Sequence, residues 1–314
     1  MGLLTYVVKK LLIGIPVIFG VTIILFYIMY MLPGDPIKLL LAGERVTPAK
    51  IEELRRAWGL DQPVYIQYFY WLSHVVRGDL GVSIVTKEPV TFLISQRLPY
   101  TLALMLISTL LSYTIGVISG ILTALRRGTL VDSVVSIAGI VGYSIPGFWF
   151  GLMLMLAFGR YLQLLPISGY EGPHSLILPA LSLALPSSAY VMRLTRAEMI
   201  EVLNEDYIRT AWAKGLNERR VLLVHALRNA MIPVVVMFFL DIPWLIGGAV
   251  VIETLFALPG MGRLLYVSII RQDYAVVQGK VLIITVLTVV FNTLGDIVIA
   301  VLDPRVRVER GGGV

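Results

Sequence analysis

The sequence predicts an all-α membrane protein with six transmembrane helices. Apolar residues make up 57% of the 314 residues and charged residues only 15%, whereas a soluble domain carries about 25% charged residues. Lipid offers no partner to backbone N–H and C=O groups, and the apolar runs do not alternate as barrel strands would, so helices are expected. Stretches near the roughly 20 residues that span hydrocarbon lie at about 11–32, 100–124, 134–158, 176–195, 230–252 and 280–302.

The first stretch, 11–32, is expected to remain as the first span. It is longer than the apolar region of a signal peptide, about 7–15 residues, and it lacks a small-x-small cleavage site. Fourteen Lys and Arg residues flank the predicted spans on one side against four on the other. The positive-inside rule therefore places both termini in the cytoplasm.

The net charge of +6 follows from this topology. The basic residues are spread over the flanks of the spans and do not gather on one face, so the expected partner is the lipid bilayer and no nucleic acid. The chain contains no cysteine, which excludes disulfides, a thiol nucleophile and thiolate metal sites.

The stretch 33–99 is expected to be a helical external insert between spans one and two. Thr47 and Pro48 form an N-cap followed by proline at the first helical position, and Gly59 ends that helix. A second helix is expected from Pro63 to Arg77. The insert either shields the loops between spans or docks an external partner. The chain then divides into 1–32, 33–99 and a five-helix core at 100–314.

Glycine and proline interrupt several spans. Gly116 and Gly120 lie four residues apart, as do Gly147 and Gly151. Such pairs allow helices to approach closely, and we expect them to pack spans within this chain, with a homodimer contact as the alternative. Proline breaks, as at Pro146, are tolerated where they face protein or a water-filled cavity, so they indicate the lining of a pathway. Simple kinks are the alternative.

Polar groups within the predicted spans complete the candidate pathway. A carboxylate at membrane depth needs a cavity or a partner, so Asp241 is a candidate contact for a cationic part of a cargo. Alternatively, it pairs with a donor on a neighbouring helix and fixes packing. Glu253 is expected at the external end of the fifth span, where a charge needs no special partner. The full candidate pathway set is Asp241, Tyr143, Ser144, Trp149 and Asn292.

Catalytic motifs are absent. The sequence has no GxxxxGK[ST] phosphate loop, no HExxH zinc pair and no GxSxG nucleophile elbow. The three histidines lie in different predicted loops and faces, and a lone histidine is more often a packing residue than a ligand. We therefore predict neither an enzyme nor a metal site.

The stretch 196–229 is expected to be a cytoplasmic loop of the form helix, turn, helix. Helix-forming residues run up to Ala213, and Gly215 provides the turn. Ile208 and Trp212 lie four residues apart on one face, where the groove of another protein is expected to close. A helix that lies on lipid headgroups is the alternative, although nearby acidic residues weaken attraction to anionic lipid.

Sequence strings along the chain carry a family resemblance. The segment 206–233, DYIRTAWAKGLNERRVLLVHALRNAMIP, resembles the EAA region of ABC-transporter permeases of the dipeptide, oligopeptide and nickel type. Further matching strings are LPGDP (32–36), GLDQP (59–63), RGDLGVS (77–83), LPALSLALP (178–186), GGAVVIETLFALPGMGRLL (247–265), QDYAVVQG (272–279) and DPRVR (303–307). The chain most resembles the first of the two permease subunits in such importers.

The resemblance implies the type I ABC importer permease fold in a prokaryotic inner or plasma membrane. It also implies four kinds of partner, namely a second homologous permease, two cytoplasmic ATPase subunits, an extracytoplasmic solute-binding protein and lipid. ATP and Mg would then be bound by the ATPase subunits, and this chain would hold no cofactor. Its function would be to form half of a pathway for di- or oligopeptides by alternating access.

In such permeases a short helix of the EAA region sits in a cleft of the ATPase. The residues that match it here are Tyr207, Arg209, Thr210, Ala211, Ala213, Lys214 and Gly215. This chain has Arg209, Thr210 and Ala211 where the general pattern has Glu-Ala-Ala, so no salt bridge is inferred from that pattern's glutamate.

Three hypotheses follow for function. In the first, the chain is an ABC permease subunit for peptides, with a nickel chelate or an oligosaccharide as the alternative cargo. In the second, it is an autonomous secondary transporter, which often shows internal repeats that this sequence lacks. In the third, it is a membrane scaffold or receptor subunit that moves nothing. Only the first predicts a stoichiometric ATPase partner.

Overall fold

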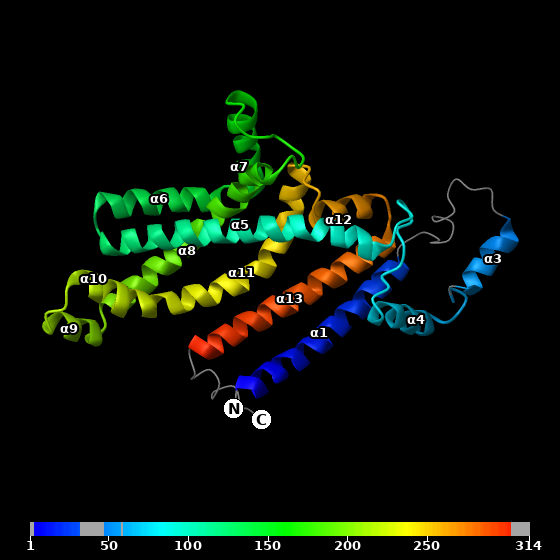
Figure 1. Ribbon diagram of the computed structural model, residues 1–314, viewed down its shortest axis with the longest axis horizontal. Helices are drawn as coiled ribbons and strands as arrows, with labels where there is room; N and C mark the ends of the chain where they lie inside the picture. Colours follow the sequence, from blue (N-terminus) through cyan, green and yellow to red (C-terminus); the bar gives the residue numbers. More distant parts are fainter. Residues whose placement is uncertain (1–2, 32–46, 58, 303–314) are drawn as a thin grey trace. The chain divides into compact units, whose positions relative to one another are not determined.

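The computed structural model describes residues 3–31, 47–57 and 59–302 of the chain (Figure 1). Within these ranges the regular structure is helical, apart from one bridge between Val82 and Pro89, so the predicted all-α class is confirmed. The LPGDP and DPRVR strings, and the first part of the predicted insert, lie outside the described residues.

The helices of the described chain are α1 (Leu3–Met31), α3 (Pro48–Ala57), α4 (Val64–Val76), α5 (Val90–Leu125), α6 (Leu130–Ser144), α7 (Gly147–Leu154), a π-helix (Met155–Tyr161), a 3₁₀ turn (Pro173–Leu176), α8 (Ile177–Leu203), α9 (Asp206–Ala213), α10 (Glu218–Arg220), a second π-helix (Val221–Ala226), α11 (Leu227–Leu255), α12 (Met261–Ile270) and α13 (Tyr274–Leu302). The two helices predicted between residues 47 and 78 are present as α3 and α4. Helix α5 begins at Val90, inside the stretch assigned to the insert.

Five helices of the described chain are long and apolar enough to cross a membrane. Their bounds are Val7–Met31, Val90–Leu125, Pro173–Leu203, Glu218–Ile242 and Tyr274–Val301. A sixth span results only if α6 and the helical segment after it are taken together, and these two are bent by 101°. The bend follows from Pro146, which disfavours the helical conformation of the preceding residue. Ile145 is accordingly extended, with φ −84° and ψ 124°.

The chain divides into two compact units, and the boundaries fall within helices. The first unit contains the described residues of 3–8, 100–263 and 290–302, and the second contains those of 9–99 and 264–289. In the first unit, α8 packs against α6, α7 and α11 (Figure 1).

Small residues bring α5 and α8 close together in the first unit. A Cβ atom placed on Gly116 would lie 2.5 Å from the Cβ of Val191, and one placed on Gly120 would lie 2.6 Å from the Cβ of Thr195. The prediction that this pair packs spans within the chain is therefore confirmed. Gly151 meets Ser182 and Phe256 in the same way, at 3.0 and 3.2 Å.

Replacing Gly120 by alanine is expected to destabilise the protein by about 1–3 kcal/mol, as over-packing does in other tight interiors. The new methyl group would lie 2.7 Å from the backbone carbonyl oxygen of Met192, which cannot rotate away. Gly142→Ala is the matched control, because no atom lies within 4 Å of its Cβ position. Thermal unfolding in detergent measures the difference, and equal shifts in the two variants would contradict the close approach.

In the second unit, an aromatic cluster joins α1 to α4. The Tyr68 side chain is 5% exposed, and its Oη lies 2.9 Å from Oγ1 of Thr22 on α1. Its ring makes an edge contact with Phe26 at a centroid distance of 5.5 Å, and Trp71 stacks at an angle on the same Phe26 ring. Helix α4 is therefore a packed part of this unit.

Two of the motif strings also meet in the second unit. The hydroxyl of Ser83, the last residue of RGDLGVS, donates to Oδ2 of Asp273 at 2.5 Å, and the Ile84 N–H donates to Oδ1 at 3.2 Å. Asp273 belongs to QDYAVVQG and is 3% exposed. Gly279, at the end of that string, lies directly against Val90. Residues about 190 positions apart in sequence thus form one buried polar anchor.

Candidate functional site

The 196–229 loop forms a compact elbow at one end of the α8 and α11 helices (Figure 1). Helix α8 ends at Leu203, α9 follows over Asp206–Ala213, and a turn leads into α10. Asn217 caps α10, because its Oδ1 accepts the Arg220 N–H at 2.9 Å. The predicted turn and the helices on both sides of it are confirmed, but the first helical run is interrupted between Leu203 and Asp206.

The turn after α9 is a Schellman motif. The N–H of Gly215 donates to the carbonyl of Trp212 at 2.9 Å, and the N–H of Leu216 donates to that of Ala211 at 3.4 Å. Gly215 has φ +73°, a conformation that glycine adopts without the penalty that a Cβ imposes. The sequence signal, a glycine directly after a helical run, identified this position correctly.

One face of α9 is fixed to its own chain. Ile208 and Ala211 are 1% and 6% exposed, and they belong to a buried apolar cluster with Met199 of α8 and Val221 and Ala226 of the π-helix that precedes α11. Leu216 packs against the same cluster. The expectation that Ile208 faces a partner's groove is wrong, since the side chain is used to seat α9 on the ends of the neighbouring helices.

The other face of α9 is open. Tyr207 and Trp212 are 42% and 45% exposed. Of the seven residues that match the EAA region, six are exposed, and Ala211 alone is buried. The exposed face of α9, as the term is used below, consists of Tyr207, Arg209, Thr210, Trp212, Ala213 and Lys214.

Hydrogen bonds order the exposed face. The amide of Asn229 on α11 donates both to Oη of Tyr207 at 3.0 Å and to the carbonyl of His225 at 2.9 Å. Thr210 Oγ1 donates to the Asp206 carbonyl at 2.9 Å. The contribution of Asn229 was missed by sequence reasoning, because a bond between residues 22 positions apart leaves no local pattern.

A bidentate ion pair joins α6 to α8 next to the elbow. Nε and Nη2 of Arg196 donate to the two carboxylate oxygens of Asp132 at 2.9 and 2.8 Å. Asp132 also accepts the Gly128 N–H at 3.0 Å, and Thr129 caps the same helix. This planar pairing is the strong form of a charged hydrogen bond, and it fixes the start of α6 against α8. No local sequence pattern indicates this pair, because its two residues lie 64 positions apart.

The five candidate pathway residues are not gathered at one point. Tyr143 is 55% exposed, and the Arg193 guanidinium lies over its ring, with Cζ 5.0 Å from the ring centroid. The Ser144 hydroxyl donates to the Ile140 carbonyl of its own helix. Trp149 and Asn292 are exposed. No hydrogen bond, ion pair or ring contact joins any two of the five in the part of the chain that the structure describes.

Asp241 is the candidate with a specific neighbour. Tyr113 of α5, which is 9% exposed, donates its hydroxyl to Oδ2 of Asp241 at 2.6 Å. The Tyr113 ring packs edge-on against Phe238, one turn before Asp241 on α11. Pairing with a donor on a neighbouring helix is the alternative that the sequence analysis offers for Asp241, and Tyr113 is such a donor.

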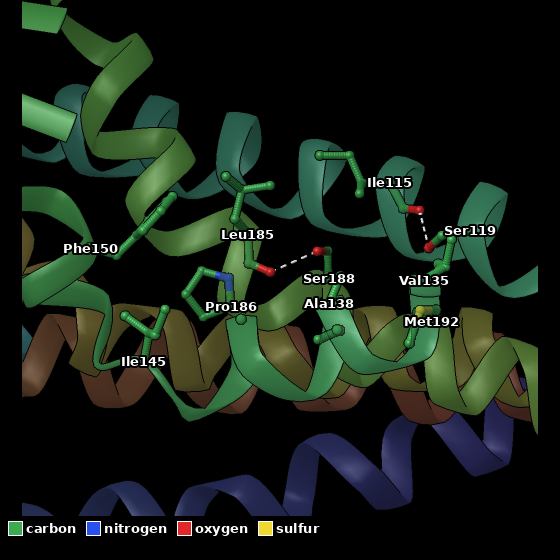
Figure 2. Close-up of a pocket in the computed structure, with 13 residues that line it drawn as sticks. Ile115, Ser119, Val135, Ala138, Ile145, Phe150, Leu185, Pro186, Ser188 and Met192 are labelled. Atoms are coloured by element: carbon green, nitrogen blue, oxygen red, sulfur yellow. Dashed lines mark hydrogen bonds between the residues drawn. The ribbon is translucent and has the colours of Figure 1, made fainter. Parts of the chain in front are cut away.

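A groove of about 330 Å³ lies between α5, α6 and α8, beside the corner between α6 and α7 (Figure 2). It is mainly apolar, and its hydroxyl groups are satisfied locally: Ser119 donates to the Ile115 carbonyl at 2.6 Å and Ser188 to the Leu185 carbonyl at 2.7 Å. None of the five candidate pathway residues lines it.

Glu253 departs from its expected setting. The expectation of an exposed charge at a span end is wrong, because the residue is 1% exposed. Its Oε1 accepts the Thr101 hydroxyl at 2.5 Å, and Oε2 accepts the N–H groups of Gly262 and Arg263 at 2.6 and 3.2 Å. The carboxylate therefore caps the N-terminus of α12, where its negative charge is stabilised. Among the described residues, no group of three or more Asp, Glu or His side chains could hold a metal ion.

Comparison with known proteins gives consistent matches. The family described as binding-protein-dependent transport system inner membrane component matches residues 113–308, and the N-terminal component of the same transport systems matches residues 3–105. The chain is 42% identical to the oligopeptide transport system permease protein AppB of Bacillus subtilis (strain 168), over 96% of this chain and 99% of that protein.

Two further likenesses extend this result. The di/tripeptide transport system permease protein DppB of Pseudomonas aeruginosa (strain UCBPP-PA14) is 38% identical over 98% of this chain and 100% of its own length. A solved structure of inward facing conformations of the MetNI methionine ABC transporter has a TM-score of 0.57 at 16% identity, and covers 68% of this chain and 97% of that chain. At 16% identity, the likeness to the MetNI structure shows the fold alone.

Proposed function

The chain belongs to the family of binding-protein-dependent transport system inner membrane components, and we propose that it forms half of the translocation pathway of an ATP-driven importer of short peptides. Its relatives at 42% and 38% identity are named for oligopeptide and di/tripeptide transport. A nickel chelate or an oligosaccharide is the alternative cargo, and the solutes retained by the cognate binding protein decide between them.

The observation that supports a role in coupling to the ATPase is the asymmetry of α9. One face is seated by Ile208 and Ala211 in the buried cluster, while the opposite face presents two aromatic side chains and basic groups to its surroundings. Aromatic and arginine side chains dominate the binding energy of protein interfaces. We assign this exposed face to the cleft of a cytoplasmic ATPase subunit, which would bind the ATP and Mg that this chain has no motif to bind.

The expected assembly contains two permease chains, two ATPase subunits and an extracytoplasmic binding protein. Both termini and the elbow are placed on the cytoplasmic side by the positive-inside rule. In this arrangement, closure of the ATPases moves α9, and the buried cluster passes that displacement to α8 and α11. A nucleotide shifts the balance between outward-open and inward-open packings only if it binds one of them more tightly than the other. The resulting coupling free energy is typically about 1–3 kcal/mol.

The test is loss of ATPase binding on truncation of the exposed aromatics. Tyr207→Ala and Trp212→Ala are each expected to weaken ATPase capture at least about tenfold, as hot-spot truncations do, and to lower peptide uptake with it. Tyr65→Ala, an aromatic truncation on α4 where the side chain is 60% exposed, is the control and should leave ATPase capture unchanged. Co-purification of the ATPase with the detergent-solubilised complex provides the measurement.

Two results would contradict the proposal. Undiminished capture of the ATPase by both variants would exclude the exposed face of α9 as its docking surface. Substrate uptake by the chain in liposomes without any ATPase would instead support an autonomous transporter.

A further inference from the structure

The Asp241 carboxyl group is only partly satisfied by the described structure. Its carboxylate lies in α11 and accepts one hydrogen bond, from the Tyr113 hydroxyl at 2.6 Å. No Lys, Arg or His side chain forms an ion pair with it among the described residues. The phenol therefore satisfies one oxygen atom of the carboxyl group and supplies no positive charge to it. An ionisable side chain within a membrane-spanning helix is costly and is normally retained for function.

The second oxygen of the carboxylate is open. Oδ1 accepts no hydrogen bond from the described residues, and it is not among their buried atoms that lack a partner. Asp241 itself is only partly buried. An incoming donor can therefore reach Oδ1 while Tyr113 holds Oδ2.

The surroundings of the pair restrict what that donor can be. Tyr113 packs with Val191 and Val234 in a buried apolar cluster, and the Phe238 ring stands edge-on to it at 5.1 Å. In such a setting a carboxylate discriminates strongly in favour of a positively charged donor, because the apolar neighbours provide little solvation.

We propose that Asp241 binds the α-ammonium group of the transported peptide, and that Tyr113 is its positioning residue. This inference rests on the proposed function as a peptide importer and names the chemical group that the pathway selects, a free cationic amino terminus. Tyr113 orients the carboxylate through Oδ2, so that Oδ1 points to the cargo. The preference is for peptides with a free amino terminus over the same peptides with an acylated one.

The experiment compares one tripeptide with its N-acetylated form. Binding of each to the permease–ATPase complex in nanodiscs, without the binding protein, is measured for the wild type and for Asp241→Asn. The wild type is expected to bind the free-amino peptide roughly 10- to 100-fold more tightly, the range for a hydrogen bond to a charged group. Asp241→Asn should remove that preference and leave the affinity for the acetylated peptide unchanged.

The variants separate recognition from packing. Asparagine still accepts the Tyr113 hydrogen bond, so Asp241→Asn should unfold at the wild-type temperature. Tyr113→Phe is expected to reduce the free-to-acetylated ratio only in part, since the carboxylate remains but is no longer oriented. Asp61→Asn, which removes an exposed carboxylate outside the spans, and Tyr266→Phe, which removes an exposed hydroxyl, are the matched controls and should keep the full ratio.

The outcomes also separate this inference from the proposed function. If Asp241→Asn keeps the preference, or if the wild type binds both peptides equally or neither, the assignment of Asp241 is overturned. ATP-dependent peptide import by the complete wild-type transporter is measured in parallel. If the Asp241 assignment fails but the wild-type transporter still imports the peptide, the proposed function stands. If there is no import, the proposed function and the Asp241 assignment are both overturned.

Discussion

Replacing Glu253 by alanine is expected to destabilise the protein by about 3–5 kcal/mol, because the loss leaves several buried donors without an acceptor. The N–H groups of Gly262 and Arg263 and the hydroxyl of Thr101 all donate to this carboxylate. Thr101 in turn accepts the Met261 N–H at 2.8 Å, so the substitution disturbs both the end of α11 and the start of α12.

The consequence is measurable as a lower unfolding temperature and as reduced recovery of the protein from membranes. Glu253→Gln should be intermediate, since its amide oxygen can replace only part of the acceptor capacity. Glu201→Ala, at an exposed position of α8, is the control for removing a glutamate. If Glu253→Ala unfolded at the wild-type temperature, the carboxylate would not be the cap that organises this junction.

Two substitutions at adjacent positions of α9 are expected to reduce uptake strongly, for different reasons. Ala211→Asp places a charge in a cluster where the side chain is 6% exposed, and burying an unpaired charge costs several kcal/mol. Helix α9 should therefore detach from the elbow. Thr210→Asp acts on the exposed face and should leave the elbow folded while it prevents ATPase docking. Both variants should lose ATP-dependent peptide uptake by at least about tenfold.

Limited trypsin digestion distinguishes the two mechanisms. Detachment of α9 should make the bonds after Lys214, Arg219 and Arg220 more accessible, so Ala211→Asp is expected to be cleaved there several times faster than the wild type, and Thr210→Asp at the wild-type rate. Thr210→Ser, which retains the hydroxyl that donates to Asp206, is the control. A wild-type digestion pattern for Ala211→Asp would contradict the buried placement, and wild-type uptake by Thr210→Asp would contradict docking.

Local chemistry explains which features could be predicted from the sequence. Apolar runs predict helices because a membrane leaves the backbone no other partner, and the described residues are helical almost throughout. The α3 and α4 helices, the Schellman turn at Gly215 and the tight α5–α8 approach at Gly120 each depend on a residue type at a fixed local spacing. Such local signals can be recognised without knowledge of the tertiary structure.

Features that depend on distant partners could not be predicted. The buried setting of Glu253 requires Thr101 to lie beside it, 152 positions away, and the role of Asp132 requires Arg196, 64 positions away. The helical period placed Ile208 and Trp212 together, but only the packed ends of α8 and α11 decide which side of α9 is covered. For the candidate pathway residues, the sequence identifies polar side chains within the predicted spans. It does not indicate which of these side chains bonds to a residue on another helix.

The corner between α6 and α7 restricts what can surround it. A chain that turns by 101° at Pro146 leaves the last carbonyls of one helix and the first amides of the next without helical partners. Hydrocarbon would penalise each of these groups by several kcal/mol, so acyl chains cannot be their neighbours. Water or protein has to solvate them, so this bend, which Tyr143, Ser144 and Trp149 flank, is expected to face away from the acyl chains.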